Sequence, residues 1–326
     1  MNQNPIFLLG SHRSGAGLLR HFLDGHSQIF CVPIETHFFR LMHYWVDYQF
    51  QSEQPKSLPL DQLLDRFNFW ISHCNQSKDT YTDSEAFGLF KEDKFQLKLI
   101  DLFDVKNPKK SFEAYIQAIY YSIMGNVLSD GLRILEKSAE HAEFAHDLKG
   151  FYPQAKFIHV IRNPYATLVS LRKFKSVEGI YPQLTKILQT LHNHYYFLYQ
   201  NKRTISDYLI VRYEDLVSQP QRQLDDICDF LEIPFESPLL SPTRLGKKWK
   251  GNSMNGERFE SIESSHLDSW KSQIAPIEIA YINHLFPFVL EDYQYDTLQI
   301  PKGFWKPQKG EYFSRYLQNR FLQYFF

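Results

Sequence analysis

The segment from residue 5 to 40 constrains the fold most, because it joins an apolar run, a glycine-rich loop and a helical pattern. The apolar run at residues 6–9 is bounded by Pro5 and Gly10, which is typical of a short buried strand. The loop at residues 10–17 reads GSHRSGAG, and leucines and a phenylalanine at helical spacing follow it. Inward-pointing loop amides and a helix N-terminus both favour an anion. The segment therefore predicts a strand, a phosphate-binding loop and a helix.

The loop matches only part of a Walker A sequence. Gly10 and Gly15 have the GxxxxG spacing, but Ala16 and Gly17 stand where a P-loop nucleoside triphosphatase carries Lys and Ser or Thr. The cation of the loop is Arg13. Because the hydroxyl ligand for Mg²⁺ is missing, the usual triphosphatase mechanism is not expected. We predict a phosphate site whose chemistry needs no metal.

Five motifs occur in order between residue 5 and about residue 295. HRSGAG follows the first strand, and a later strand ends in Arg162 with Ser170 eight residues on, at the expected start of a helix. The other three are VRYEDL at 211–216, WKGNS at 249–253 and LDSWK at 267–271. The ordered set resembles the sulfotransferases that use 3′-phosphoadenosine 5′-phosphosulfate (PAPS), whose first signature is PRSGTT or PKSGTT.

The resemblance implies a single sulfotransferase domain over residues 1–326, an α/β fold with a P-loop-like central parallel sheet flanked by helices. Strand-like runs that alternate with helical ones also favour a parallel sheet, with functional loops at its carboxyl ends. Residues 41–130 are expected to form a mainly helical insertion. The aromatic tail at about 301–326 is expected to dock on the core, although it could also line the acceptor entrance or contact a partner or a membrane surface. Expected strands are 6–9, 29–32, 133–135, 156–161 and 208–211, and expected helices are 144–151, 164–175, 184–199, 221–231 and 276–286.

The resemblance implies PAPS as the donor, 3′,5′-adenosine bisphosphate as the product, and no metal. Its 5′-phosphosulfate would lie in the loop, held by Arg13 and by the backbone amides of Ser14, Gly15, Ala16 and Gly17. Ala16 and Gly17 replace the family's Thr or Ser pair, so two hydroxyl contacts to the donor are lost.

The resemblance also implies which residues bind the rest of the nucleotide. Arg162 and Ser170 would bind the 3′-phosphate, for which a guanidinium fork is well suited. Tyr213 would pack on the adenine; the alternative is a tyrosine of the core. A late segment consists of Lys250, Gly251, Asn252 and Ser253. In the family the corresponding segment closes on the nucleotide; the alternative is an ordinary surface loop.

Glu35 is the expected catalytic base, because the segment PIETH is similar to the ETHFF or EET segment of tyrosylprotein, bacterial and carbohydrate sulfotransferases. His37 is the alternative base. The cytosolic enzymes use a His in a KTH segment, but Ala139 stands at that position here. Lys137 would contact the bridging oxygen of the leaving phosphate, and Arg13 would stabilise the transferred group. Without the resemblance, Glu35 reads as a surface or capping carboxylate and Lys137 as a solvated lysine.

The predicted reaction moves a sulfuryl group to an acceptor hydroxyl of a carbohydrate, a tyrosyl side chain or a specialised metabolite. A nucleotide kinase-like enzyme and a non-catalytic nucleotide- or glycan-binding protein are the alternatives. A net charge of −1 indicates no nucleic-acid partner, and the lack of an apolar run near 18 residues indicates no membrane span. The three cysteines show no metal spacing and suggest reduced thiols. With an apparent strand starting at residue 6, a cytoplasmic location is expected. The sequence leaves the oligomeric state open.

Overall fold

The computed structural model describes residues 4–46, 58–76, 86–129, 131–175, 184–249, 251 and 266–300. Within these residues, one parallel sheet has the strand order β2-β3-β1-β4-β5. Its strands are β1 (Ile6–Leu9), β2 (Ile29–Cys31), β3 (Arg133–Lys137), β4 (Lys156–Ile161) and β5 (Tyr208–Arg212). The first strand is central, so the loop that follows it lies at the middle of the sheet's carboxyl edge.

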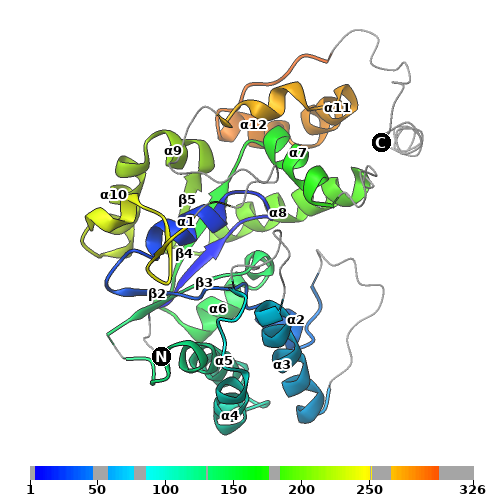
Figure 1. The fold of residues 1–326 in the computed structure, drawn as a ribbon. Helices are drawn as coiled ribbons and strands as arrows, with labels where there is room; N and C mark the ends of the chain where they lie inside the picture. The colour runs from blue at the N-terminus through cyan, green and yellow to red at the C-terminus, as the bar shows by residue number, and fades with distance from the viewer. Residues whose placement is uncertain are drawn as a thin grey trace.

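Helices cover both faces of the sheet and extend beyond it (Figure 1). They are α1 (Ala16–Leu23), α2 (Phe38–Leu41), α3 (Leu60–Gln76), α4 (Glu92–Leu102), α5 (Pro108–Met124), α6 (Ala145–Phe151), α7 (Pro164–Lys175), α8 (Leu184–Thr204), α9 (Tyr213–Ser218), α10 (Pro220–Leu231), α11 (Pro276–Leu285) and α12 (Pro287–Asp292). Short elements are the 3₁₀ helices η3 (Ala139–Ala142), η4 (Ser237–Leu240) and η6 (Ser269–Ser272), and the antiparallel pair β6 (Thr243–Arg244) and β7 (Lys247–Lys248).

Strand β1 is apolar throughout because both of its faces are buried. Ile6 and Leu8 pack in a cluster with residues of α1 and α10, whereas Phe7 and Leu9 pack in another with residues of α5 and α6. Phe7 lies 6.1 Å from the ring of Phe112 on α5. Alternate side chains of a strand point to opposite faces, so a continuous apolar run is what a two-sided parallel sheet requires.

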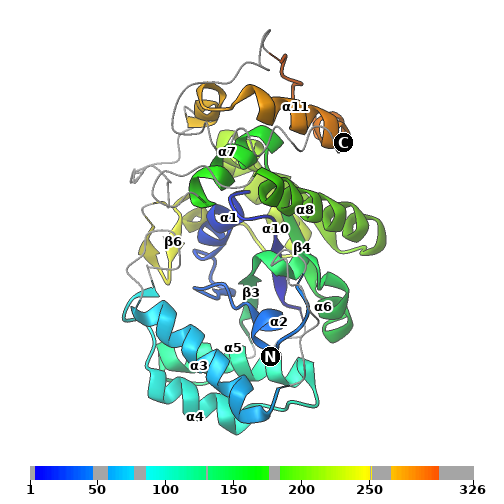
Figure 2. The same cartoon turned by 90° about the vertical axis from the view of Figure 1, so that its right-hand side faces the viewer.

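The expected α/β architecture is confirmed, and the described part of residues 41–130 is helical, with α3, α4 and α5 between β2 and β3. These three helices lie together at one end of the molecule, and α11 and α12 lie at the opposite end (Figures 1 and 2). A third cluster of buried side chains joins α7, α8, α11 and α12.

Several predicted boundaries were wrong by a few residues. The helix expected at 184–199 continues to Thr204, where Lys202 and Arg203 suit the negative end of the helix dipole. The strand expected at 133–135 continues to Lys137. Ser170 lies in the middle of α7 rather than at a helix start. Residues 301–326 lie outside the described residues, as do Lys250, Asn252 and Ser253.

In the described part of the chain, no helix has both the length and the hydropathy needed to cross a membrane.

Candidate active site

The loop between β1 and α1 has a backbone that only glycine accommodates at two positions. Gly10 has φ +147°, and a Cβ there would lie 2.6 Å from Ser14 Oγ and 2.9 Å from the Val160 carbonyl oxygen. Gly15 has φ +100° and is the N-cap residue of α1. Arg13 also has a positive φ, +69°. The glycines thus let the loop turn tightly at the positive end of a helix.

The loop is contacted by Arg162, which directly follows β4, and by residues of α7 and α9. Tyr213 covers Gly15 so closely that a Cβ on Gly15 would lie 2.2 Å from Tyr213 Cδ2. Arg162 Cζ lies 4.6 Å from the centre of the same ring, and Arg162 Nη1 donates to the Arg13 carbonyl oxygen at 3.3 Å. Arg13 Nε donates to Ser170 Oγ at 3.0 Å. Five residues predicted from separate motifs therefore meet around one loop.

Two polar groups beside the loop fit a ligand site. Ser14 Oγ and Arg162 Nε are buried, and neither has a hydrogen-bond partner among the described residues. Buried polar atoms are nearly always hydrogen-bonded in native proteins. An anionic group in the loop would supply acceptors for both. The residues present therefore suit a phosphate ester.

Glu35 and Lys137 form an ion pair at the carboxyl ends of β2 and β3. The second carboxylate oxygen of Glu35 accepts from the Ala139 amide at 3.3 Å, and Trp70 Nε1 donates to the Glu35 carbonyl oxygen at 2.9 Å. Burial opposes ionisation of Glu35, but Lys137 and two nearby histidines outweigh it and hold its pKa well below the usual range. Glu35 is therefore an ionised carboxylate held in a fixed position.

His37 is anchored by a second buried carboxylate. Its Nδ1 lies 2.9 and 3.0 Å from the two oxygens of Glu140, and its backbone amide donates to Ser138 Oγ at 3.1 Å. Burial opposes ionisation of Glu140, but His37 outweighs it and lowers the Glu140 pKa to about 2. Because Nδ1 is engaged with Glu140, only Nε2 of His37 is available to act as the alternative base.

Glu136, which the sequence analysis did not select, ties the Glu35 segment to β3. Thr36 Oγ1 and Ser138 Oγ each donate to Glu136 Oε1 at 2.7 Å. His141 Nδ1 lies 2.5 Å from Glu136 Oε2; burial lowers the His141 pKa, but Glu136 outweighs it and the net shift is upward. This buried cluster fixes the backbone that carries Glu35.

His12 was also missed, although its place beside Arg13 in the loop was a usable signal. Its ring stacks on Phe174 with centroids 5.8 Å apart. Burial lowers the His12 pKa to about 4, even though the Glu35 carboxylate raises it. A neutral imidazole therefore lies close to the Glu35 carboxylate.

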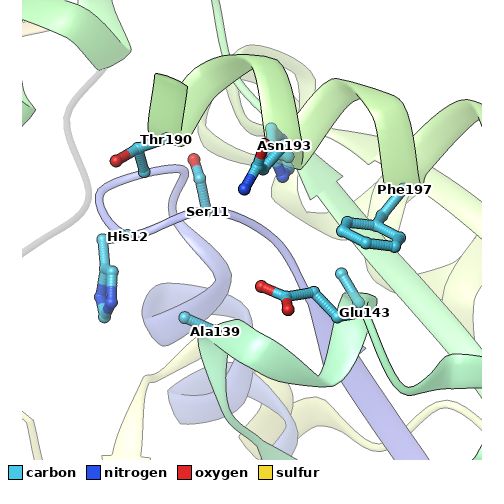
Figure 3. A pocket seen from close by; sticks show the side chains of 9 residues that line it. Ser11, His12, Ala139, Glu143, Thr190, Asn193 and Phe197 are labelled. Atoms are coloured by element: carbon cyan, nitrogen blue, oxygen red, sulfur yellow. The ribbon is translucent and has the colours of Figure 1, made fainter. Parts of the chain in front are cut away.

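A recess opens between the loop, η3 and α8 (Figure 3). Its volume is about 350 Å³, including the opening to solvent. The described residues that line it are Ser11, His12, Ala139, Ala142, Glu143, Thr190, Asn193, His194 and Phe197.

Two further predictions concern metal and the late segment. The described residues contain no group of three or more His, Cys, Asp or Glu arranged to hold a metal ion. Of the late segment, the structure describes only Gly251, which has φ +84°. Its predicted closure on the nucleotide stays a prediction.

Comparison with known proteins identifies a family and two similar folds. The sequence model of the sulfotransferase family matches residues 5–237. The fold is similar to the sulfotransferase domain from the olefin synthase of Synechococcus PCC 7002, with a TM-score of 0.55 and 23% identity over 90% of this chain and 96% of that one. The sulfotransferase domain from the curacin biosynthetic pathway gives 0.56 and 21%, over 90% of this chain and 99% of that one. No curated protein sequence matches significantly.

Proposed function

The chain belongs to the sulfotransferase family, and we propose that it transfers a sulfuryl group from PAPS to an acceptor hydroxyl. The convergence of Arg13, Gly15, Arg162, Ser170 and Tyr213 around one loop carries this proposal. The acceptor is a carbohydrate, a tyrosyl side chain or a specialised metabolite.

The donor is bound through its two phosphorylated ends. The 5′-phosphosulfate lies over the loop amides of Ser14 to Gly17, at the positive end of α1. Arg162 and Ser170 hold the 3′-phosphate, a group that AMP and ATP lack. Tyr213, already stacked with Arg162, provides an aromatic face for the adenine.

The transfer is in line, and side chains rather than a metal ion offset the charges that develop during it. The acceptor oxygen forms a bond to sulfur while the bond from sulfur to the bridging phosphate oxygen breaks, and that electron pair leaves with 3′,5′-adenosine bisphosphate. Glu35 takes the acceptor proton. Lys137 offsets the charge that grows on the leaving oxygen, and Arg13 the charge on the sulfuryl oxygens.

Two alternatives give different results in one experiment. A nucleotide kinase-like enzyme requires Mg²⁺ and transfers phosphate, and a binding protein turns nothing over. The test is transfer of ³⁵S from labelled PAPS, and in parallel of ³²P from ATP labelled at the γ-phosphate, to a panel of hydroxyl acceptors with and without EDTA. We expect ³⁵S on an acceptor in both conditions and no ³²P. A strict need for metal, or nucleotide binding without any transfer over the panel, would contradict the proposal.

A further inference from the structure

The connection between β2 and α2, residues 32–37, carries both Glu35 and His37 but belongs to neither element. His37, the N-cap residue of α2, has φ +49°, a left-handed conformation that is unfavourable for a residue with a side chain. A backbone in such a conformation persists only where its surroundings hold it. The position of Glu35 therefore depends on the contacts that fix this connection.

Two elements that are far apart in the sequence hold the connection. Thr36 Oγ1 donates to Glu136 of β3 at 2.7 Å. Trp70 of α3 donates through Nε1 to the carbonyl oxygen of Glu35 itself at 2.9 Å. Trp70 lies in the mainly helical insertion between β2 and β3, 35 residues after Glu35. The insertion thus contributes a hydrogen bond to the backbone of the proposed base.

The indole of Trp70 is itself packed among three side chains. Its ring meets the His37 ring edge to face, with centroids 4.9 Å apart and planes at 73°. Arg40 Cζ lies 5.2 Å from the centre of the indole, and the His73 ring stacks on it at 5.6 Å. A side chain packed in this way has few other rotamers open to it. The indole N–H therefore stays directed at the Glu35 carbonyl oxygen.

The same helix also holds the far end of α2. Arg66, one turn before Trp70 on α3, donates to the carbonyl oxygens of Arg40 and Leu41 at 2.7 and 2.9 Å. Residues four apart lie on one face of a helix, so α3 contacts both ends of the α2 segment with one face. Helix α3 thereby fixes Glu35 and α2 as a unit.

A displacement of the Glu35 backbone would move the carboxylate away from its partners. Those partners are the Lys137 ammonium and the Ala139 amide. Transfer reactions are sensitive to misplacement of a reacting group by about 1 Å, even when the cause lies outside the reaction centre. The contacts proposed for the nucleotide involve the loop, Arg162 and Tyr213 instead. Loss of the Trp70 contact should therefore slow the transfer without weakening donor binding.

We propose that Trp70 is a positioning residue for the proposed base, whose indole N–H fixes the backbone of Glu35 so that the carboxylate stays against Lys137 and the Ala139 amide. The inference rests on the proposed function and adds a positioning residue to it. It also gives helix α3 of the insertion a part in the reaction.

The first test needs no turnover. Trp70→Phe keeps an aromatic ring beside His37 but removes the N–H donor, and Phe69→Leu, at a side chain 72% exposed on the same helix, is the control. The measurement is amide hydrogen exchange of the full chain at Ala139, whose amide donates to the Glu35 carboxylate. Exchange there should be about tenfold faster in Trp70→Phe, because one hydrogen bond that holds Glu35 is lost, and unchanged in the control.

The second test is a double-mutant cycle on transfer of ³⁵S. Trp70→Phe should lower kcat by about 10–100-fold, with unchanged affinity for 3′,5′-adenosine bisphosphate. In a Glu35→Gln background the same change should have little further effect, since a residue that acts through Glu35 then has no base left to position. In a His37→Ala background its effect should persist in full.

Two results would overturn the inference. One is unaltered exchange at Ala139 in Trp70→Phe, and the other is a loss of kcat that stays equally large when Glu35 is already Gln. A wild-type chain that transfers no ³⁵S would instead remove the proposed function, and exchange at Ala139 would still decide whether Trp70 fixes Glu35.

Discussion

Lys137 donates to the carboxylate of Glu35, so the proposed leaving-group cation and the proposed base form one buried ion pair. While the pair is intact, Glu35 is held as an anion and the charge of Lys137 is already compensated. A donor whose bridging oxygen approaches Lys137 competes for that ammonium. As the ammonium turns toward the donor, the Glu35 carboxylate loses its main counterion and becomes a stronger base. We therefore expect donor binding and activation of the proposed base to be linked.

Replacing Lys137 tests this link. Lys137→Ala should lower kcat by about 10²–10³-fold with a smaller change in nucleotide affinity, since its charge matters most when the leaving oxygen becomes anionic. Without Lys137 the Glu35 pKa should rise, so the acidic limb of the pH–rate profile should move to higher pH. Lys110→Ala, at an exposed site on α5, is the control. Normal turnover in Lys137→Ala would end the leaving-group assignment.

Glu35 and His37 can be distinguished by paired substitutions. Glu35→Gln keeps shape but cannot accept a proton, so turnover should fall by about 10²–10⁴-fold while nucleotide affinity hardly changes. His37→Ala should reduce turnover less, yet should destabilise the fold, by about 1–3 kcal/mol, because the buried Glu140 carboxylate loses its hydrogen-bond partner, His37 Nδ1. Rates and urea unfolding are both measured. An inactive but stable His37→Ala beside an active Glu35→Gln would transfer the base role to His37.

Gly15 and Gly17 form a matched pair for alanine substitution. At Gly15 the positive φ and the Tyr213 ring 2.2 Å from the new Cβ both oppose Ala, so Gly15→Ala should displace Tyr213 and weaken the affinity for 3′,5′-adenosine bisphosphate. At Gly17, inside α1, a Cβ meets nothing within 4 Å. Gly17→Ala should therefore keep nucleotide affinity and raise stability by about 0.5–1 kcal/mol. Calorimetry and thermal unfolding test both, and equal effects would argue against Tyr213 as a wall of the site.

The sequence predicted the parallel sheet, the loop and the meeting of separate motifs, because strand ends and glycine loops have local signatures. It did not predict that Glu136 and Glu140 are fully buried. Their burial is tolerated because each has a polar partner, Thr36 and His37 respectively, and these partners lie about 100 residues earlier in the chain. Pairing over that distance depends on the β2–β3 register, which no local pattern encodes. His12 was overlooked for a similar reason: only the folded chain brings its ring near enough to Glu35 for the carboxylate to raise its pKa.

Arg162 should determine the choice between nucleotides. Arg162→Ala should weaken binding of 3′,5′-adenosine bisphosphate by about 10–100-fold, because a charge-assisted contact to the 3′-phosphate is lost, but should affect AMP much less. Arg222→Ala, at an exposed position on α10, controls for net charge. Calorimetry without magnesium is the measurement. A wild-type protein that binds AMP as tightly as the bisphosphate would contradict the donor assignment, whatever the variant does.

Buried histidines should make the fold sensitive to acid. Burial lowers the pKa of His194 to about 3, and burial together with His194 lowers that of His159 well below 6.5; the two rings contact each other at 3.2 Å. Both imidazoles bind protons more readily in the unfolded chain than in the folded one. Their contribution to the free energy of unfolding is therefore fully present above pH 6.5, and it is lost as the pH falls toward their pKa in the folded protein. His141, whose pKa is raised, acts in the opposite direction: its contribution is present below pH 6.5 and is lost as pH rises through its folded pKa.

The pH dependence of urea unfolding measures this balance. The free energy of unfolding should fall between pH 6.5 and 5, with His194 alone accounting for about 2 kcal/mol. His194→Gln should make the decline shallower by that amount, since a neutral side chain replaces a group that must otherwise stay unprotonated in the core. His284→Gln, at an exposed position on α11, is the control. A decline equally steep in His194→Gln would mean that His194 is hydrated and titrates alike in the folded and unfolded chain.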